Sequence, residues 1–313
     1  MTTPLPGLHH VTAIAADPQR NLDFYAGLLG LRLVKRTVNF DDPNAYHLYY
    51  GDAAGNPGSI ITFFLWPGAR TGREGTGQAT ATAFAIPTGS IDFWRERLTG
   101  RAITVSEGTR FDQRLLTFAD PDGMRIELIA ADDVAVRPGW DHGPVPAMHA
   151  VRGLHSVTLS EDGRGRIRAA LPGLVGFTLL GQEGPRRRYA AAAGGSGALV
   201  DVLATPEGRP GIVAAGTVHH VAWRTADDAS QLEWQRDLAA HGVGVSPVMD
   251  RDYFHSIYFR EPGGVLFEIA TDPPGFAVDE PADALGTALK LPEWLEAQRA
   301  QIARHLPPLR IPA

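Results

Sequence analysis

The chain has 313 residues, a formal net charge of −6 and no cysteine, which excludes disulfides, thiolate metal sites and cysteine nucleophiles. Its apolar (44%) and charged (20%) fractions are those of an ordinary globular protein of about two domains, and it lacks the basic balance of a nucleic-acid-binding protein. No apolar run approaches the ~18 residues of a membrane span, and MTTPLPGLHH lacks a secretory pattern, so a cytoplasmic protein is expected.

Along the chain, the pattern of apolar and polar residues predicts four segments with the same order of elements. Each has a short alternating strand, a polar break with Asp, an amphipathic helix and three further strands. The segments cover residues 7–66, 79–131, 152–205 and 217–271. In the first, the helix PQRNLDFYAGLLG carries an apolar stripe made of Leu22, Tyr25, Leu28 and Leu29. Such a repeat predicts an α+β fold of four βαβββ modules in two tandem domains.

Matching positions strengthen the duplication. Four residues of the second module recur 141 residues later in the fourth: Arg110, Pro121, Gly123 and Glu127 correspond to Arg251, Pro262, Gly264 and Glu268. Pro-Asp-Gly and Pro-Gly-Gly within these stretches predict tight hairpin turns that lead into a final strand.

The domain boundaries follow from composition. Residues 1–135 form the predicted N-terminal domain, and residues 136–150, with three prolines, form a linker. Residues 151–275 form the C-terminal domain. The extension 276–313 is Pro-rich and then offers a short helix, LPEWLEAQRAQIARHL.

Two histidine doublets stand in the first strands of modules one and four. Because side chains of a strand alternate between faces, only one member of His9-His10 and one of His219-His220 is expected to enter a given cavity. His10 and His220 each lie seven residues before the Asp of the following break. The repeat therefore selects these two.

An acidic residue completes the candidate constellation. Glu268 lies between apolar neighbours in VLFEIA, and a buried carboxylate needs a partner. With His10 and His220 it gives two imidazoles and one carboxylate, the ligand set of non-haem Fe(II) oxygen enzymes. Mn(II) or another divalent metal is compatible with the same ligands. Three protein ligands leave positions open for a substrate and O2.

The spacing alone leaves a second arrangement open. His155 also lies seven residues before an Asp, and Asp201 occupies in module three the place that Glu268 holds in module four. If modules three and four share a cavity, His155 replaces His10 and Asp201 is a further candidate. If modules one and four share it, module one offers Phe63 at the carboxylate position.

Other titratable residues are interpreted as structural. Glu127 has the strand context of Glu268, but its module has no His in the first strand, so Glu127 is interpreted as a relic of the repeat or as part of a structural salt bridge. Six histidines carry no spacing argument and are interpreted as surface or loop residues: His47, His142, His149, His241, His255 and His305.

The modular plan resembles the vicinal-oxygen-chelate superfamily, which includes glyoxalases, bleomycin-resistance proteins and extradiol dioxygenases. Within it, LHHVT, VKRTVNFDDPNAYHLYYGD, VHHVAW and RDYFHSIYFREPGGVLFE resemble the hydroquinone-type ring-cleaving dioxygenases, over residues 7–290. The resemblance implies pairs of modules that form curved mixed-sheet cups, with modules one and four forming the active one. It also implies Fe(II), O2 and a hydroquinone or catechol-like aromatic diol as substrate.

The resemblance further implies roles for single residues. Its iron ligands correspond to His10, His220 and Glu268, and the residues around them correspond to His9, Thr12, His219, Arg251 and Tyr258. Arg251 is expected to stabilise an oxyanion, Tyr258 to donate a hydrogen bond, and His9 or His219 to move protons with a near-neutral pKa.

Two other functions compete with this interpretation. A glyoxalase-type lyase or isomerase requires a fourth protein ligand, for which Asp201 and Glu127 are the candidates. A non-catalytic small-molecule-binding protein needs no such ligand set. Six Trp and thirteen Phe also permit an apolar interface between copies of the chain.

Overall fold

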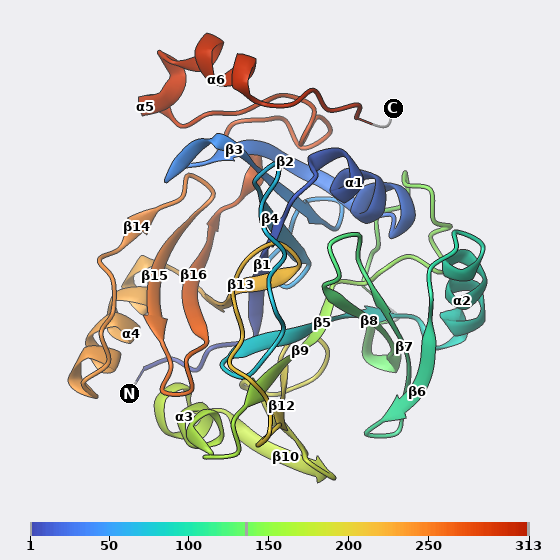
Figure 1. The fold of residues 1–313 in the computed structure, drawn as a ribbon. Coiled ribbons are helices and arrows are strands. Elements are labelled where there is room, and N and C mark those ends of the chain that lie inside the picture. The colour runs from blue at the N-terminus through green and yellow to red at the C-terminus, as the bar shows by residue number, and fades with distance from the viewer. Residues whose placement is uncertain (1, 135–136, 312–313) are drawn as a thin grey trace.

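The computed structural model describes residues 2–134 and 137–311, so the predicted boundary between 135 and 136 lies outside the described residues. Two curled eight-stranded sheets make up the fold (Figure 1). The first sheet has the order β14-β15-β16-β13-β1-β4-β3-β2. Its strands are β1 Leu8–Ala15, β2 Arg32–Asn39, β3 Asp42–Gly51, β4 Ile60–Leu65, β13 Thr217–Thr225, β14 Met249–Asp250, β15 Phe254–Arg260 and β16 Leu266–Pro274.

The second sheet has the order β10-β11-β12-β9-β5-β8-β7-β6. Its strands are β5 Gln78–Ile86, β6 Ser106–Arg110, β7 Gln113–Ala119, β8 Arg125–Ala130, β9 Leu154–Glu161, β10 Thr178–Glu183, β11 Arg186–Ala190 and β12 Leu199–Ala204. The predicted α+β fold of four βαβββ modules is confirmed.

Each sheet takes one module from either side of the segment 136–150. Modules one and four pair through β1 and β13, which run antiparallel at the centre of the first sheet. Modules two and three pair in the same way through β5 and β9. Of the two pairings that the spacing left open, the structure therefore has modules one and four together.

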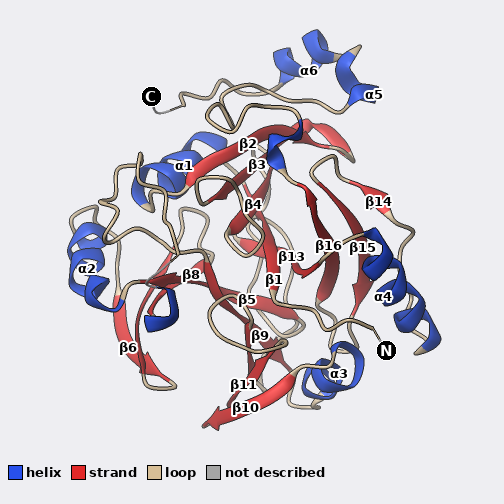
Figure 2. Cartoon of the chain, turned by 180° about the vertical axis from the view of Figure 1, so that it is seen from behind, coloured by secondary structure: helices blue, strands red, loops and turns tan. Residues whose placement is uncertain are grey.

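Helices cover the outer side of the strands, as Figure 2 shows from behind. They are α1 Pro18–Leu22, α2 Ile91–Thr99, α3 Arg166–Val175, α4 Asp228–Ala240, α5 Glu293–Glu296 and α6 Arg299–His305, with a π-helical turn Asp23–Leu28 and short 3₁₀ turns Thr88–Ser90, Asp132–Val134 and Phe276–Val278. The apolar stripe predicted for the first helix is buried in the main core. In the described part of the chain, no helix is both long enough and apolar enough to span a membrane.

The polar breaks before the helices differ between modules. Asp17 caps α1 by accepting the backbone N–H of Arg20 at 2.9 Å, and Asp227 caps α4 by accepting that of Ser230 at 2.8 Å. In module three the residue before α3 is instead a left-handed Gly165. The seven-residue spacing from His155 to its Asp therefore does not mark an equivalent helix start.

The two predicted hairpin turns are present. Gly123 (φ 92°) and Gly264 (φ 107°) take up backbone conformations that favour glycine, and each turn leads into the last strand of its module. These turns fix the register of β8 and β16, the strands that carry Glu127 and Glu268.

The C-terminal extension packs over β2 and β3, at the top of Figure 1. Lys35 of β2 is fully buried beneath it and is neutralised by Asp279 and Glu280, while its ammonium also donates to the carbonyl of Phe276 at 3.2 Å. The extension therefore covers the β2 edge of the first sheet and neutralises its buried lysine.

Candidate metal centre

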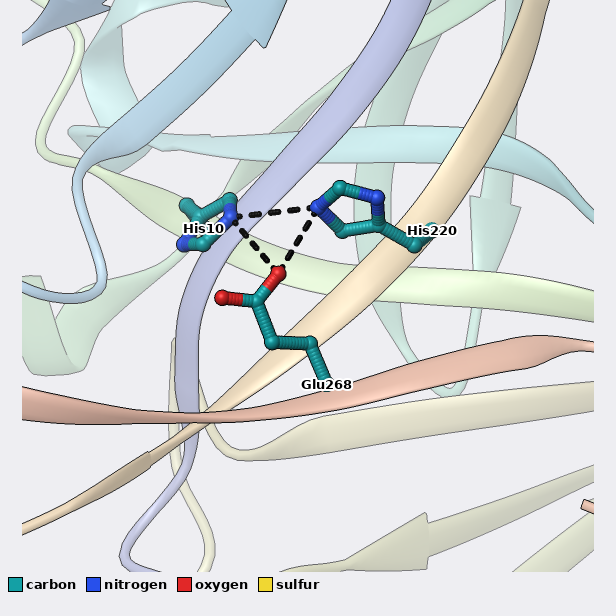
Figure 3. A group of neighbouring side chains, drawn as sticks. All are labelled: His10, His220 and Glu268. Carbon is teal, nitrogen blue, oxygen red and sulfur yellow. Dashed lines mark hydrogen bonds and ion pairs between the residues drawn. The ribbon is translucent and has the colours of Figure 1, made fainter. Parts of the chain in front are cut away.

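Three side chains from adjacent strands converge inside the first sheet (Figure 3). The Nε2 atoms of His10 and His220 lie 3.3 Å apart, and the Oε2 atom of Glu268 lies 3.4 Å from the first and 2.9 Å from the second. All three residues are at most 4% exposed. In the described part of the chain, no other group of three His, Asp or Glu ligand atoms is close enough to hold a metal.

The donor atoms fit a divalent cation. Oε1 of Glu268 accepts the Ser256 hydroxyl at 2.5 Å, but Oε2 is buried without a well-formed hydrogen bond. A carboxylate oxygen left in this state is costly unless a positive charge compensates it. Two imidazole nitrogens and this oxygen, all facing one point, supply the lone pairs that such a cation needs. The buried triad therefore indicates a divalent metal.

The expectation that only one histidine of each doublet enters the cavity holds for His9-His10, of which only His10 lines it, and is wrong for His219-His220, which both line it. Strand pairing is irregular at both doublets. Between the pairs Leu8–Trp223 and His10–Ala222, β1 has one extra residue, His9. Further along, between Thr12–His220 and Ala13–Val218, β13 has one extra residue, His219. Each irregularity is a β-bulge, which breaks strict alternation and brings the rings of neighbouring residues together.

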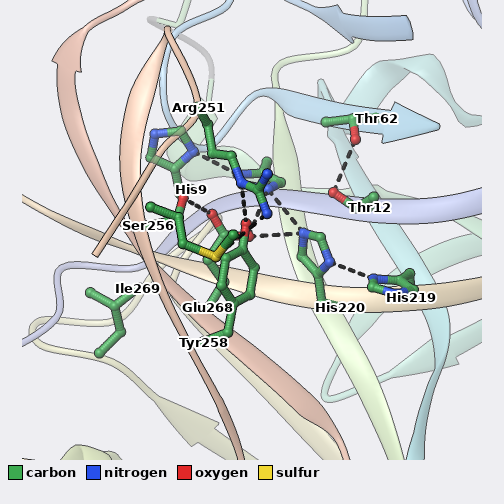
Figure 4. Close-up of polar contacts among 12 residues, drawn as sticks. His9, Thr12, Thr62, His219, His220, Arg251, Ser256, Tyr258, Glu268 and Ile269 are labelled. Carbon is green, nitrogen blue, oxygen red and sulfur yellow. Dashed lines mark hydrogen bonds and ion pairs between the residues drawn. The ribbon is translucent and has the colours of Figure 1, made fainter. Parts of the chain in front are cut away.

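Within each doublet the two rings are hydrogen-bonded to each other. The Nδ1 atoms of His9 and His10 lie 2.9 Å apart, and those of His219 and His220 lie 2.8 Å apart (Figure 4). In the tautomer that leaves Nε2 free for a metal, the inner ring donates from Nδ1 and the outer ring accepts. Such contacts fix the orientation of metal-ligating imidazoles.

Burial keeps the outer rings uncharged. It lowers the pKa of His219 to about 3 and holds the pKa of His9 well below 6.5. The near-neutral pKa expected for both from the sequence is therefore wrong. Burial also lowers the pKa of His220, which keeps its ring in the form that ligates metals. For Glu268, burial alone would raise the pKa, but His10 and His220 beside it lower it well below 4.5.

A cavity of about 240 Å³ opens above the triad. Besides the triad, four of the five surrounding residues predicted from the sequence line it: Thr12, His219, Arg251 and Tyr258. His9 does not line it, because its ring lies behind His10 and against Phe254, with ring centres 4.9 Å apart.

Arg251 and Tyr258 form a polar wall of the cavity. The Nε atom of Arg251 donates to the Tyr258 hydroxyl oxygen at 3.3 Å, and the guanidinium lies 5.5 Å from the centre of the same ring. Tyr258 pairs with Glu268 across β15 and β16. Burial raises the pKa of Tyr258, so its hydroxyl keeps a proton that it can donate.

His47 is a cavity residue that the sequence interpretation missed. It lines the cavity with its ring between two hydroxyls, Nε2 at 2.8 Å from Thr62 and Nδ1 at 2.9 Å from Tyr49. The Thr62 hydroxyl also lies 2.9 Å from that of Thr12. Alternation in YHLYYGD could have revealed it, because Leu48 faces the core and its neighbours face the other side. The cavity lining includes none of the other five histidines that were interpreted as surface or loop residues, His142, His149, His241, His255 and His305.

The strand register also corrects the carboxylate position of module one. Thr12 and Ala222 are equivalent, since each lies two residues after the histidine ligand of its strand. Thr12 pairs with Thr62 and Ala222 pairs with Glu268, so Thr62 and not Phe63 is the counterpart of the acidic ligand. Phe63 is fully buried in the core on the helix side.

The alternative ligands lie in the second sheet. Asp201 accepts Nε of Arg188 at 2.8 Å, and His155 bonds the neighbouring Ser156 at 3.0 Å. Glu127 receives two hydrogen bonds from Arg110, at 2.6 and 2.7 Å, so the predicted salt bridge is confirmed. None of these groups reaches the triad.

Comparisons with known proteins agree with this geometry. The family model described as the Glyoxalase/Bleomycin resistance protein/Dioxygenase superfamily matches residues 7–128 and 173–269. MhqO of Bacillus subtilis (strain 168), described as a proposed ring-cleaving dioxygenase, is 47% identical over 305 residues, which cover 97% of each chain. A chlorohydroquinone/hydroquinone 1,2-dioxygenase of Sphingobium indicum is 37% identical over 96% of this chain and 95% of its own length.

Solved structures show the same fold. A crystal structure of a proposed dioxygenase from Bacillus subtilis has a TM-score of 0.93 and 46% identity, and covers 100% of this chain and 99% of its own. Glyoxalase I from Zea mays has a TM-score of 0.62 at 16% identity, over 85% of this chain and 92% of its own, and shows similarity of fold alone. The chain therefore belongs to the glyoxalase/bleomycin resistance protein/dioxygenase superfamily.

Proposed function

We propose that the protein is an Fe(II)-dependent, extradiol-type ring-cleaving dioxygenase that acts on a hydroquinone or catechol-like aromatic diol with O2. The observation that carries the proposal is a buried His-His-Glu triad at the base of a cavity with aromatic walls. Mn(II) is compatible with the same ligands. The named activity of the Sphingobium indicum relative supports the substrate class.

The cavity suits a single aromatic ring. Its volume of about 240 Å³ lies below the roughly 300–1,000 Å³ typical of sites for drug-sized ligands. Phe64, Trp66 and Phe254 supply apolar surface for the faces and edges of a ring, while the polar groups lie toward the triad and Arg251. A ring hydroxyl directed at the triad leaves the rest of the diol among these aromatic side chains.

When bound, Fe(II) supplies Lewis acidity and the redox capacity that O2 chemistry requires. The chain supplies the ligands and their orientation: His9 and His219 hold the rings of His10 and His220 through the Nδ1 contacts. Because Nδ1 of His219 accepts, its proton is on Nε2, and it is available to a substrate in the cavity that it lines.

Arg251 and Tyr258 act on developing negative charge. The guanidinium is a fixed cation at the cavity wall, placed to stabilise an oxyanion on the opening ring. Its Nε–H bond to the phenol oxygen leaves the Tyr258 proton free to be donated to substrate oxygen. Thr12 contributes a hydroxyl that is already oriented by Thr62.

A lyase or isomerase mechanism of the glyoxalase type receives less support. Its expected fourth ligand, Asp201 or Glu127, lies in the second sheet and is neutralised by arginine. A protein that only binds small molecules does not need the buried His-His-Glu triad.

Anaerobic loading with Fe(II), followed by oxygen uptake with a series of substituted hydroquinones and catechols, tests the proposal. We expect stoichiometric iron, oxygen consumption and loss of the aromatic absorbance of one class of ring diol. A protein that holds one iron per chain and consumes oxygen with none of these diols would contradict the proposal.

A further inference from the structure

The mouth of the cavity is crossed by a single ion pair. Phe40 and Asp41 form the two-residue turn between β2 and β3, and both line the cavity. From the opposite side, Nη2 of Arg251 lies 3.5 Å from Oδ2 of Asp41. The pair therefore joins module one to module four at the cavity that the metal triad also lines.

Asp41 is the only carboxylate of the described residues within ion-pair distance of Arg251. The other side-chain groups that Arg251 contacts are neutral, the Tyr258 hydroxyl oxygen and the sulfur of Met249 at 3.7 Å. The Arg251 side chain is 18% exposed and that of Asp41 is 69% exposed, so the anion lies on the outer side of the cation. Asp41 therefore lies nearer the solvent than Arg251 and offsets part of its charge.

We propose that Asp41 is a specificity-determining residue that makes the cavity select uncharged ring diols over diols that carry a carboxylate. The inference rests on the proposed function and adds the charge class of the substrate. An anionic ring substituent near the mouth is repelled by Asp41, and the pairing with Asp41 weakens the attraction that Arg251 would otherwise exert. Without Asp41, the cavity wall presents an unpaired guanidinium, which favours an anion.

The turn that carries Asp41 is supported from outside by the C-terminal extension. The ring of Trp294 in α5 meets that of Phe40 edge to face, with centres 5.5 Å apart. Asn39 also accepts the backbone N–H of Asp41 at 2.9 Å. Trp294 is thus a positioning residue for the charge at the mouth, which gives the C-terminal extension a role in selectivity.

Anaerobic calorimetry on the Fe(II)-loaded protein tests the inference without turnover. The probes are 2,5-dihydroxyphenylacetate and its neutral amide, which differ in charge and little in shape. Exposed ion pairs contribute ~1 kcal/mol or less, so in Asp41→Asn we expect the affinity ratio of acid to amide to rise about fivefold. High salt should shrink this shift.

Asp92→Asn is the matched control, because its side chain is 67% exposed and it lies on α2 beside the second sheet. It should leave the affinity ratio unchanged. Trp294→Ala should shift the ratio in the direction of Asp41→Asn by a smaller factor, and Trp294→Phe should restore it.

The outcomes separate the two proposals. An unchanged ratio in Asp41→Asn, with both probes bound, overturns the role of Asp41 and leaves the proposed function standing. Iron-loaded wild-type protein that consumes oxygen with no ring diol overturns the proposed function and, with it, the role of Asp41.

Discussion

The two sheets have the same plan, but only one of them assembles a metal triad. The strand registers show which residues correspond. Thr12 pairs with His220 in the first sheet and Thr158 pairs with Ala81 in the second, so Ala81 stands at the position of His220. By the same comparison, Ser156 stands at the position of His10, and Glu127 at that of Glu268. The second sheet thus has the acidic residue and neither imidazole. It also retains the bulges, with His155 as the extra residue of β9.

The second sheet neutralises its acidic residue in another way. Arg110, the counterpart of Arg251, makes a two-fold hydrogen-bonded ion pair with Glu127. Arg251 has a different partner because Tyr258 stands beside Glu268, whereas Thr117 occupies that register beside Glu127. The shorter Thr117 cannot hold the guanidinium away from the carboxylate.

The interior of the second sheet is further filled by Arg188. Its guanidinium lies 4.2 Å from the centre of the Phe111 ring and pairs with Asp201. In the second sheet a guanidinium compensates the buried carboxylate, whereas in the first sheet the carboxylate is part of a ligand set that indicates a metal ion. A few side chains decide which of the two is used.

The largest effect is expected from His220→Ala, which introduces the alanine that the second sheet has at the equivalent position, Ala81. Loss of a ligand should remove the metal and lower oxygen uptake by more than about a hundredfold, because even changes to outer partners of metal ligands cost roughly 10–100-fold. Elemental analysis and oxygen uptake measure the two effects. His155→Ala, in the other sheet, is the control. Full metal content in His220→Ala would show that the triad is not the metal site.

A smaller effect of another kind is expected from Glu127→Gln. It leaves Arg110, whose side chain is 13% exposed, without its main partner, and should lower the free energy of unfolding by about 3 kcal/mol. Chemical denaturation measures this change. Metal content should stay at the wild-type value, since Glu127 belongs to the second sheet. Metal loss without loss of stability would refute the distinction between the sheets.

The smallest effect is expected from His9→Phe. Phe preserves the packing against Phe254 but removes the Nδ1 partner of His10, so metal affinity should fall about tenfold. Competition with a chelator measures the affinity. Thr80→Ala alters the extra residue of the bulge in β5, the counterpart of His219 in the second sheet, and should have no effect. Equal affinities in His9→Phe and wild type would argue against an orienting role.

Much of this arrangement could be predicted from the sequence. The repeat at an offset of 141 residues, the apolar setting of Glu268 and the polar breaks after His10 and His220 indicate the modules and the three converging residues. These signals are local and periodic, and therefore readable along the chain. The resemblance added the roles of Thr12 and Arg251 beside the metal ligands, which the repeat does not indicate.

The remaining features depend on pairing between distant strands. Whether module four meets module one or module three is decided by contacts across the sheet, which leave no local signature. The bulges at His9 and His219 shift side chains by one position, so a strict two-residue period assigns them incorrectly. The assignment of Phe63 instead of Thr62 likewise depends on the register between β1 and β4, which pairs Thr12 with Thr62. His47 was missed although the alternation of its strand places it on the cavity side.

The nested pairing of modules has a consequence for synthesis on the ribosome. Modules two and three are contiguous and can close their sheet while the chain still grows, whereas β1 must wait for β13, some 200 residues later. Until then, module one presents an unpaired strand edge, the kind of surface that invites aggregation. Metal capture by His10 therefore comes after nearly the whole chain has emerged, so truncated products should carry no bound ion.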